Sequence, residues 1–186
     1  QIRYYPQAHP YMADVEATFR MISYARHVGT RIHIVHVNTS EGAALIAKAQ
    51  KDGLPVTGET CPQYLTFTEE VYTSGKKEAA YYILSPLIRT AADRDALWQA
   101  VATGDLKTIA TDHCPYSKEQ KFKGGDDFRT VPGGAGGIGN SLLVVYNLGV
   151  MSGRISMNQL VNSMSTNPAR IFNLYPRKGI IAVGSD

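Results

Sequence analysis

The chain has 186 residues, a net charge of +3 and a hydrophobic content of 44%. These values fit one large domain or a piece of a larger one, and they exclude a disordered chain because the apolar content is ample for a core. No apolar run approaches the roughly 20 residues of a membrane span, and no signal peptide is visible. The cationic run over 118–123 is interrupted or flanked by acids, so we interpret it as a solvated loop and expect neither a nucleic-acid nor a membrane partner.

The cysteines and the two ends of the chain suggest its setting. Cys61 and Cys114 form no CxxC pair, which argues against a disulfide framework or a structural zinc knuckle and favours a reduced, cytoplasmic setting. The chain begins at Gln1 without Met, and it stops at a strand-like run over 180–183. We therefore expect a fragment.

Helices and strands alternate in the first part of the chain. Apolar residues at steps of three or four predict the helices, and short β-branched runs predict the strands. Thr39 is expected to cap a helix, and glycines such as Gly29 are expected to end them. The predicted segments are a loop over 1–11, a helix over 11–28, a strand over 32–37, a helix over 41–51, a strand over 55–60, a short helix with a loop over 66–80, an extended segment over 81–84, a helix over 91–103 and a strand over 106–111.

The later part of the chain is organised differently. Residues 116–140 are predicted to form a long irregular loop, and three closing helices are predicted over 142–151, 157–165 and 168–174. The run Gly134-Ala135-Gly136-Gly137-Ile138-Gly139 matches GxGxxG letter for letter. However, the segment before it is too short and ends in proline, so it cannot supply the strand that dinucleotide binding needs.

Strand–helix alternation implies parallel strands joined by crossovers, in a doubly wound sheet or in part of a (β/α)₈ barrel. In both architectures ligands meet the carboxyl ends of the strands. Asn38, Thr60, Ser85 and Asp112 then share one rim, and His36 lies just inside it.

The chemistry of this rim stays open on the residues alone. His36 is either a satisfied core histidine or a ligand, and Asp112 is either a cap for the turn at Pro115 or a ligand. Imidazole nitrogen and carboxylate oxygen are both zinc ligands, yet two ligands do not make a site. Glu59 is either an acid at a strand end or a structural hydrogen-bond partner. Both cysteines are interpreted as small buried residues.

A series of short motifs follows in a fixed order along almost the whole chain. The motifs are Ile34-Val35-His36-Val37, 58–65, Ser85-Pro86, Ala96-Leu97-Trp98, Thr111-Asp112-His113-Cys114, Gln120-Lys121, Asp126-Asp127-Phe128, 165–169 and 172–179. In these motifs and their order, the chain closely resembles the C-terminal half of dihydropyrimidinases and bacterial D-hydantoinases, which are cyclic amidohydrolases. Gln63 favours this branch over the dihydroorotases, and Asp112 distinguishes the chain from the non-enzymatic collapsin response mediators.

The resemblance implies the C-terminal part of a (β/α)₈ barrel over 1–174, with 175–186 beginning a return to a small β-sandwich domain. It implies two divalent metal ions, usually zinc, with His36 and Asp112 as ligands and Asp112 also moving a proton. Ser85 and the backbone around Gly133 would bind the amide groups of a cyclic substrate, whose ring a metal-bridged hydroxide opens. This chain has Pro132-Gly133-Gly134 where the family usually has Pro-Asn-Gly.

The resemblance also places further ligands, including a carboxylated lysine, upstream of the matched segment. The fragment alone is therefore expected to be inactive, and the family implies a homo-oligomer, a tetramer. An allantoinase-like or dihydroorotase-like amidase, or a non-enzymatic interaction protein of the same fold, stands as the alternative.

Overall fold

A three-stranded parallel sheet forms the centre of the computed structural model, which describes residues 1–75 and 77–186. The strands are β1 (Ile32–Ile34), β2 (Val56–Thr60) and β3 (Thr108–Ile109), in the order β1-β2-β3. Ile32 pairs with Val56, and Thr60 pairs with Ile109. Both strand pairs are parallel, so the carboxyl ends of all three strands meet at one edge.

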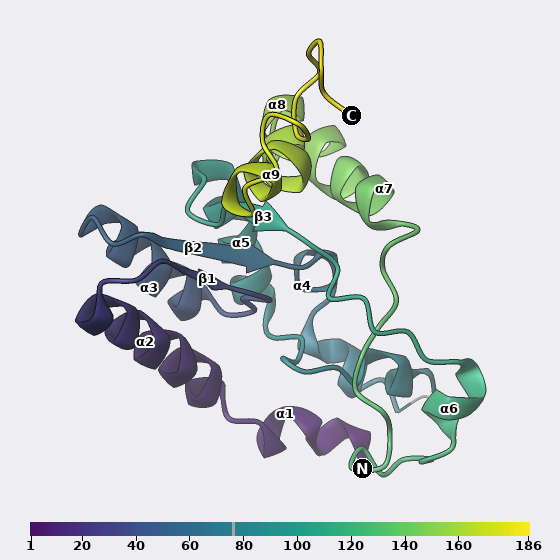
Figure 1. Ribbon diagram of the computed structural model, residues 1–186. Helices are drawn as coiled ribbons and strands as arrows, with labels where there is room; N and C mark the ends of the chain where they lie inside the picture. The colour runs from purple at the N-terminus through teal and green to yellow at the C-terminus, as the bar shows by residue number, and fades with distance from the viewer. Residues whose placement is uncertain (76) are drawn as a thin grey trace.

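Long helices cover one face of this sheet (Figure 1). The helix α2 (Tyr11–Val28) precedes β1, α3 (Ser40–Lys51) connects β1 to β2, and α5 (Ala91–Thr103) lies on the path from β2 to β3. Thr39 caps α3 by accepting from the Gly42 amide at 3.1 Å. In Figure 1, α2 and α3 lie on one side of the strands and the C-terminal helices α8 and α9 on the other.

Shorter helical segments fill the connections and the two ends of the chain. The segments η4 and η5 are π-helical and continue α7 and α8. These segments are η1 (Ile2–Tyr4), α1 (Tyr5–Ala8), α4 (Pro62–Thr66), η2 (Glu69–Tyr72), η3 (Lys77–Tyr82), α6 (Lys118–Phe122), α7 (Ser141–Val145), η4 (Tyr146–Met151), α8 (Met157–Val161), η5 (Asn162–Thr166) and α9 (Asn167–Ile171).

The strand–helix alternation, the helix bounds over 11–28 and 91–103 and the three closing helices are confirmed. Both long helices end at a glycine in the left-handed region, with φ of 66° at Gly29 and 78° at Gly104. The strands are shorter than predicted. β1 ends at Ile34 rather than at residue 37, and β3 covers two residues rather than six.

Several predictions for the connecting segments are wrong. Residues 1–11 are not a loop, because they form η1 and α1, and Pro6 lies in the first turn of α1, where its fixed backbone angle suits a helix. Residues 81 and 82 belong to η3 and are not extended. The loop over 116–140 contains α6, which a Ser117–Gln120 capping box initiates. Residues 180–183 form no strand. Of the segment predicted over 66–80, Lys76 lies outside the described residues.

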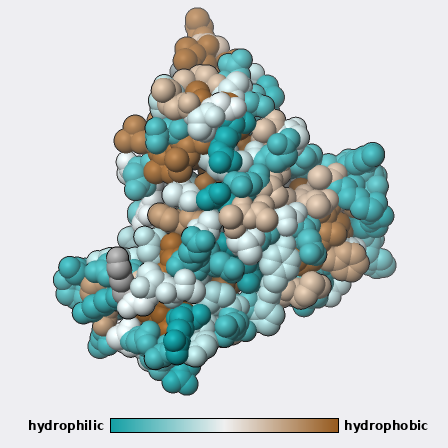
Figure 2. Space-filling view, turned by 180° about the vertical axis from the view of Figure 1, so that it is seen from behind, coloured by the Kyte–Doolittle hydropathy of each residue, from teal (hydrophilic) through white to brown (hydrophobic). Residues whose placement is uncertain are grey.

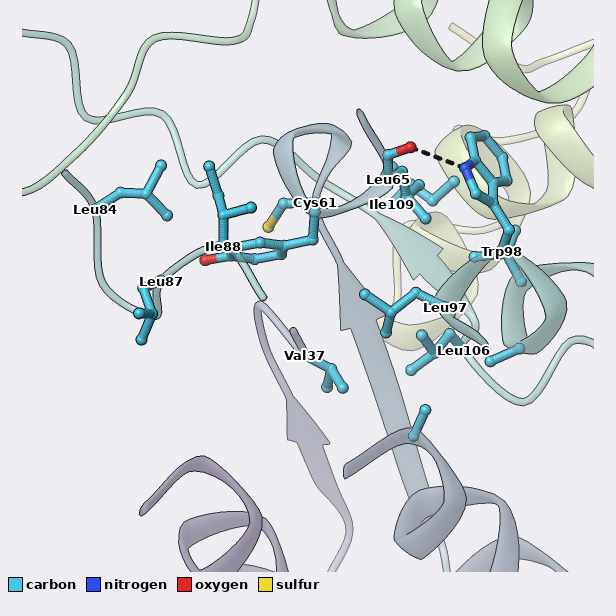
Figure 3. Close-up of a cluster of buried hydrophobic side chains, with 14 of the residues drawn as sticks. Val37, Cys61, Leu65, Leu84, Leu87, Ile88, Leu97, Trp98, Leu106 and Ile109 are labelled. Atoms are coloured by element: carbon cyan, nitrogen blue, oxygen red, sulfur yellow. Dashed lines mark hydrogen bonds between the residues drawn. The ribbon is translucent and has the colours of Figure 1, made fainter. Parts of the chain in front are cut away.

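The core lies between the sheet and its covering helices (Figure 3). Leu97, Leu106 and Ile109 are almost fully buried there, and the Trp98 indole N–H donates to the Leu65 carbonyl at 2.9 Å. Gly58 of β2 faces this core, because a Cβ on it would lie 2.7 Å from Leu106 Cδ2 and 2.8 Å from Ile46 Cδ1. The absence of a side chain at Gly58 therefore lets two core side chains meet over the central strand.

Apolar side chains also remain exposed at the C-terminal end of the molecule. Figure 2 shows hydrophobic residues gathered over the C-terminal tip and the helices beside it. Leu143 of α7 is 69% exposed, and Ile181 and Val183 in the tip are fully exposed. Isolated apolar residues are common on protein surfaces, but a gathering of them is typical of a face that contacts other protein.

We expect Gly58→Ala to lower the free energy of unfolding by about 1–3 kcal/mol, because the added methyl group overpacks the core. Gly139→Ala is the matched control, since a Cβ there meets no atom within 4 Å. Chemical denaturation followed by circular dichroism measures both variants. Equal stability of the two variants would contradict the packing assigned to Gly58.

Candidate functional site

His36 lies just beyond the end of β1 in a left-handed backbone conformation, with a φ of 44°. This turn does not break the link to β2, because the Val37 amide donates to the Glu59 carbonyl at 2.7 Å. The Thr60 hydroxyl then donates to the Val37 carbonyl at 2.8 Å. The His36 ring is half-buried and lines a hollow of about 270 Å³ between β1 and α2.

Asp112 occupies the matching position beyond β3, with a φ of 48°. The chain between β3 and Asp112 is held by β2 and α4, because the Ala110 amide donates to the Thr60 carbonyl and the Gln63 side chain donates to the Thr111 carbonyl. The Asp112 side chain is exposed. It does not cap the next helix, a role that Ser117 fills, so the interpretation of Asp112 as a cap is wrong.

The two residues predicted as metal ligands therefore share an unusual backbone conformation. Among the described residues, the non-glycine residues with positive φ are His36, Asp112 and Asn173, and Asn173 follows the end of α9. Asparagine, aspartate and histidine are enriched in this region relative to other residues, yet a non-glycine residue held there still costs of order 1–3 kcal/mol. Conformations of this kind cluster at functional sites, so the backbone marks the same two positions as the sequence.

Neither side chain is engaged by the rest of the chain. In residues 1–75 and 77–186, no hydrogen bond or ion pair is made by the His36 ring or by the Asp112 carboxylate. His33, within β1, differs: its Nδ1 lies 2.8 Å from Thr57 Oγ1, and its Nε2 lies 3.4 Å from Glu59 Oε2. His33 is thus a structural histidine, whereas His36 and Asp112 are available to a ligand.

The position of β2 sets the spacing between the two free side chains. Neighbouring strands lie about 4.8 Å apart, so β2 separates the backbones of β1 and β3 by roughly 10 Å. A ring nitrogen and a carboxylate oxygen suit zinc and similar divalent ions. The described residues bring no group of three His, Cys, Asp or Glu side chains together for a metal. The donor types therefore fit part of a metal centre, and further ligands are needed to complete one.

A buried ion pair holds the segment that follows His36. Asp14 on α2 accepts from Arg89 Nη2 at 2.6 Å and from the Asn38 side-chain amide at 2.9 Å. The same Asn38 amide group donates to the Leu87 carbonyl at 2.9 Å. Asn38 is 3% exposed, so its predicted place on the rim is structural. The network fixes the backbone two residues beyond His36 against α2 and the segment around Leu87.

Ser85 and Gly133, the predicted substrate-binding positions, lie on two loops that are bonded to each other. The Gly134 amide donates to the Ile83 carbonyl at 3.0 Å. Ser85 and Gly133 are both exposed, Ser85 precedes Pro86 through a cis peptide bond, and a Cβ on Gly133 would meet no atom within 4 Å. The hydroxyl and the backbone of these residues are therefore open to a ligand.

The glycine-rich loop is also attached to the segment that follows Asp112. His113 Nδ1 accepts from the Gly137 amide at 2.9 Å and from the Ile138 amide at 3.3 Å, and the Cys114 amide donates to the Ala135 carbonyl at 3.0 Å. A ring nitrogen that accepts carries no proton, so the other nitrogen of His113 holds it. His113 is thus a structural connection between Asp112 and this loop.

The two cysteines differ from each other. Cys61 is fully buried, and this burial raises the pKa of its thiol, as do the nearby Glu59 and Asp112 charges to a smaller extent. Cys114 is exposed, so the prediction that both cysteines are buried is wrong for Cys114. Glu59 accepts from the Thr108 hydroxyl at 3.0 Å, which supports the interpretation of Glu59 as a structural partner.

The sequence pattern of the amidohydrolase family matches residues 12–186. The chain belongs to the amidohydrolase family. It is 39% identical over 184 residues to a D-hydantoinase from Ralstonia pickettii and 37% identical to one from Geobacillus stearothermophilus. The similarity covers 98% of this chain and about 40% of those relatives. The predicted resemblance is confirmed.

Solved structures of hydantoinases and dihydropyrimidinases share this fold. A D-hydantoinase from a Bacillus species superposes with a TM-score of 0.96 at 40% identity, over 99% of this chain and 41% of the other. A dihydropyrimidinase from Brevibacillus agri gives 0.94 at 37% identity, over 40% of that chain. An L-hydantoinase from Arthrobacter aurescens gives 0.92 at 32% identity, over 41% of that chain. The three-stranded unit is thus found within larger amidohydrolases.

One property of the helices bears on membrane contact. In the described part of the chain, no helix combines the length and apolar character that crossing a bilayer requires.

We expect Arg89→Met to lower the free energy of unfolding by about 2–3 kcal/mol, because it leaves the Asp14 carboxylate without its charge partner. The value is at the low end for a buried pair because the Asp14 side chain keeps 22% exposure. Arg20→Met, which removes an ion pair with Glu16 that is more than half exposed, should change stability by less than about 0.5 kcal/mol. Thermal unfolding of both variants tests the comparison, and equal melting temperatures would show that the Arg89 pair does not hold this segment.

Proposed function

We propose that this chain is part of a metal-dependent cyclic amidase that opens hydantoin or dihydropyrimidine rings by hydrolysis. The observation that carries the proposal is the pair of unengaged ligand groups, His36 and Asp112, each held in a left-handed turn at a strand end. Family membership and the hydantoinase and dihydropyrimidinase relatives support the reaction class. Both a D-hydantoinase and an L-hydantoinase occur among the similar structures.

His36 would supply an imidazole nitrogen and Asp112 a carboxylate oxygen to a centre of two divalent ions, with zinc the first candidate. The other ligands, including a carboxylated lysine, would come from the rest of a longer protein, because this chain spans about 40% of the curated relatives it matches. When bound, such ions would lower the pKa of water toward neutrality and polarise an amide carbonyl.

The remaining steps belong to residues of this chain. As the water oxygen bonds to the ring carbonyl carbon, Asp112 accepts the proton that the water loses. Asp112 then donates this proton to the ring nitrogen as the carbon–nitrogen bond breaks, so the ring opens with water as the only reagent consumed. The Ser85 hydroxyl and the exposed backbone at Gly133 would bind the amide groups of the ring and orient it toward Asp112.

We propose further that residues 1–174 form the C-terminal part of a (β/α)₈ barrel and that 175–186 begin the return to a second, β-rich domain. The apolar side chains exposed on the C-terminal tip support this proposal, because a second domain would cover them. β1 is an edge strand, Val35 just after it is 44% exposed, and the free edge would pair with a preceding barrel strand. The isolated 186-residue chain should then have no activity.

The full-length, metal-loaded protein should open dihydrouracil or a 5-monosubstituted hydantoin, and chelation followed by dialysis should abolish the activity. Kinetics on four rings, with allantoin and dihydroorotate as the other two, identifies the substrate class. Restoration by added zinc is the control for irreversible damage. If the intact protein turns over none of the four rings, the proposal fails.

Asp112→Asn should lower kcat by roughly 10²–10⁴-fold, because the amide cannot carry the proton between water and ring nitrogen. His36→Ala should lower the bound metal measured by elemental analysis, while His27→Ala, which alters an exposed histidine at the end of α2, should leave it unchanged. Circular dichroism checks that all three variants fold. Full activity in Asp112→Asn would refute the proton-transfer role.

A further inference from the structure

Lys121 is a buried lysine that the proposed reaction does not use. It lies on the short helix α6, and 2% of it is exposed. Lysines are almost never fully buried unless their charge is paired. In the described part of the chain, however, the Lys121 ammonium forms no ion pair with a carboxylate. The burial therefore calls for an explanation from the groups that the ammonium does contact.

The Lys121 ammonium bonds two backbone carbonyls on separate loops. Nζ donates to the Ile83 carbonyl at 2.8 Å and to the Pro132 carbonyl at 2.8 Å. Ile83 lies 38 residues away along the chain and Pro132 lies 11 residues away. The Ile83 carbonyl also accepts from the Gly134 amide at 3.0 Å, so both of its lone pairs are used. One side chain thus joins the loop before Ser85 to the loop that carries Gly133.

Burial also lowers the pKa of Lys121 to about 8, with the Cys114 thiol opposing this shift. A neutral amine still has two N–H groups, which matches the two carbonyls that Lys121 bonds. The connection between the loops therefore does not depend on the charge of Lys121. Its requirement is a donor group that reaches both carbonyls from α6.

We propose that Lys121 is a positioning residue, which sets the distance between the two ring-binding loops through the Ile83 and Pro132 carbonyls without touching the ring. This inference rests on the proposed function, in which Ser85 and Gly133 bind the amide groups of the ring. The backbone before Asp112 is held independently of Lys121, because the Ala110 amide donates to the Thr60 carbonyl and the Gln63 side chain donates to the Thr111 carbonyl. Loss of Lys121 should therefore weaken substrate binding more than it slows the chemical step.

The test uses the full-length metal-loaded protein and dihydrouracil as substrate. Lys121→Met keeps the length and apolar stem but removes the donors, and it should raise KM by roughly tenfold while kcat changes by less than about threefold. Lys121→Gln keeps two N–H donors on a shorter stem and should raise KM less. Lys123→Met, at the exposed residue that follows the end of α6, is the control and should change neither value.

Amide hydrogen exchange read by mass spectrometry gives a second measurement that does not require activity. In Lys121→Met, exchange should rise in the peptides that contain residues 83–85 and 133–136, and it should stay unchanged around β1 and β2. A fall in kcat at constant KM, effects equal to those of Lys123→Met, or a uniform rise in exchange would overturn the inference. If the unmodified protein opens no ring, the proposed function fails, and the exchange measurement alone still decides whether Lys121 holds the two loops.

Discussion

The pairing of β2 with both neighbouring strands is the constraint on which the candidate site depends. β2 bonds β1 along one edge and β3 along the other, and its inward face is buried at Val56, Gly58 and Thr60. Parallel pairing brings the carboxyl ends of the outer strands to one edge. His36 and Asp112 follow those ends, so the register of β2 determines how far apart the two donor groups lie.

The same strand also explains how two left-handed residues are tolerated. Such a residue costs free energy and persists only where its surroundings leave the chain no alternative. Here β2 holds the backbone close to each turn. The Val37 amide, directly after His36, donates to a carbonyl of β2, and so does the Ala110 amide, two residues before Asp112. The turns redirect two side chains away from the ordinary alternation of a strand, which would otherwise set their direction.

The sequence predicts the elements whose formation is local. The helices over 11–28 and 91–103 follow from apolar spacing and a terminal glycine, and their bounds match the structure. The tyrosines of η3 pack against distant rings, Tyr82 against Phe67 and Tyr81 against Phe122, and the local pattern over 81–84 wrongly predicted an extended segment. The start of α6 has a local sequence signal, because Ser117 and Gln120 form the Ser-x-x-Gln pattern of a capping box.

The sequence likewise predicts some features of the candidate site and not others. Strand order and motif resemblance single out His36 and Asp112. The sequence does not show that their backbones are left-handed, because a glycine is the usual signal for that conformation and neither residue is glycine. The Gln120-Lys121 motif belongs to the resemblance, but it shows neither that Lys121 is buried nor which groups its ammonium bonds. Its partners are carbonyl groups, which every residue has, and they meet it only after loops 11 and 38 residues away have folded around α6. A role that depends on backbone atoms of distant loops cannot be read from side-chain identity.

His33 and His36 show how the fold assigns different roles to one residue type. Both lie within or next to β1, three residues apart, and each could ligate a metal by its chemistry alone. His33 faces Thr57 and Glu59, and the Phe172 ring packs against its edge with a centroid distance of 5.6 Å. A ligand could reach His33 only by displacing Glu59 and Thr57 from the two ring nitrogens. His36 lies outside that polar cluster, in a left-handed turn beyond the end of β1, and its ring nitrogens make no hydrogen bond or ion pair within the described residues. Its place in the fold, rather than its residue type, therefore makes His36 the candidate ligand.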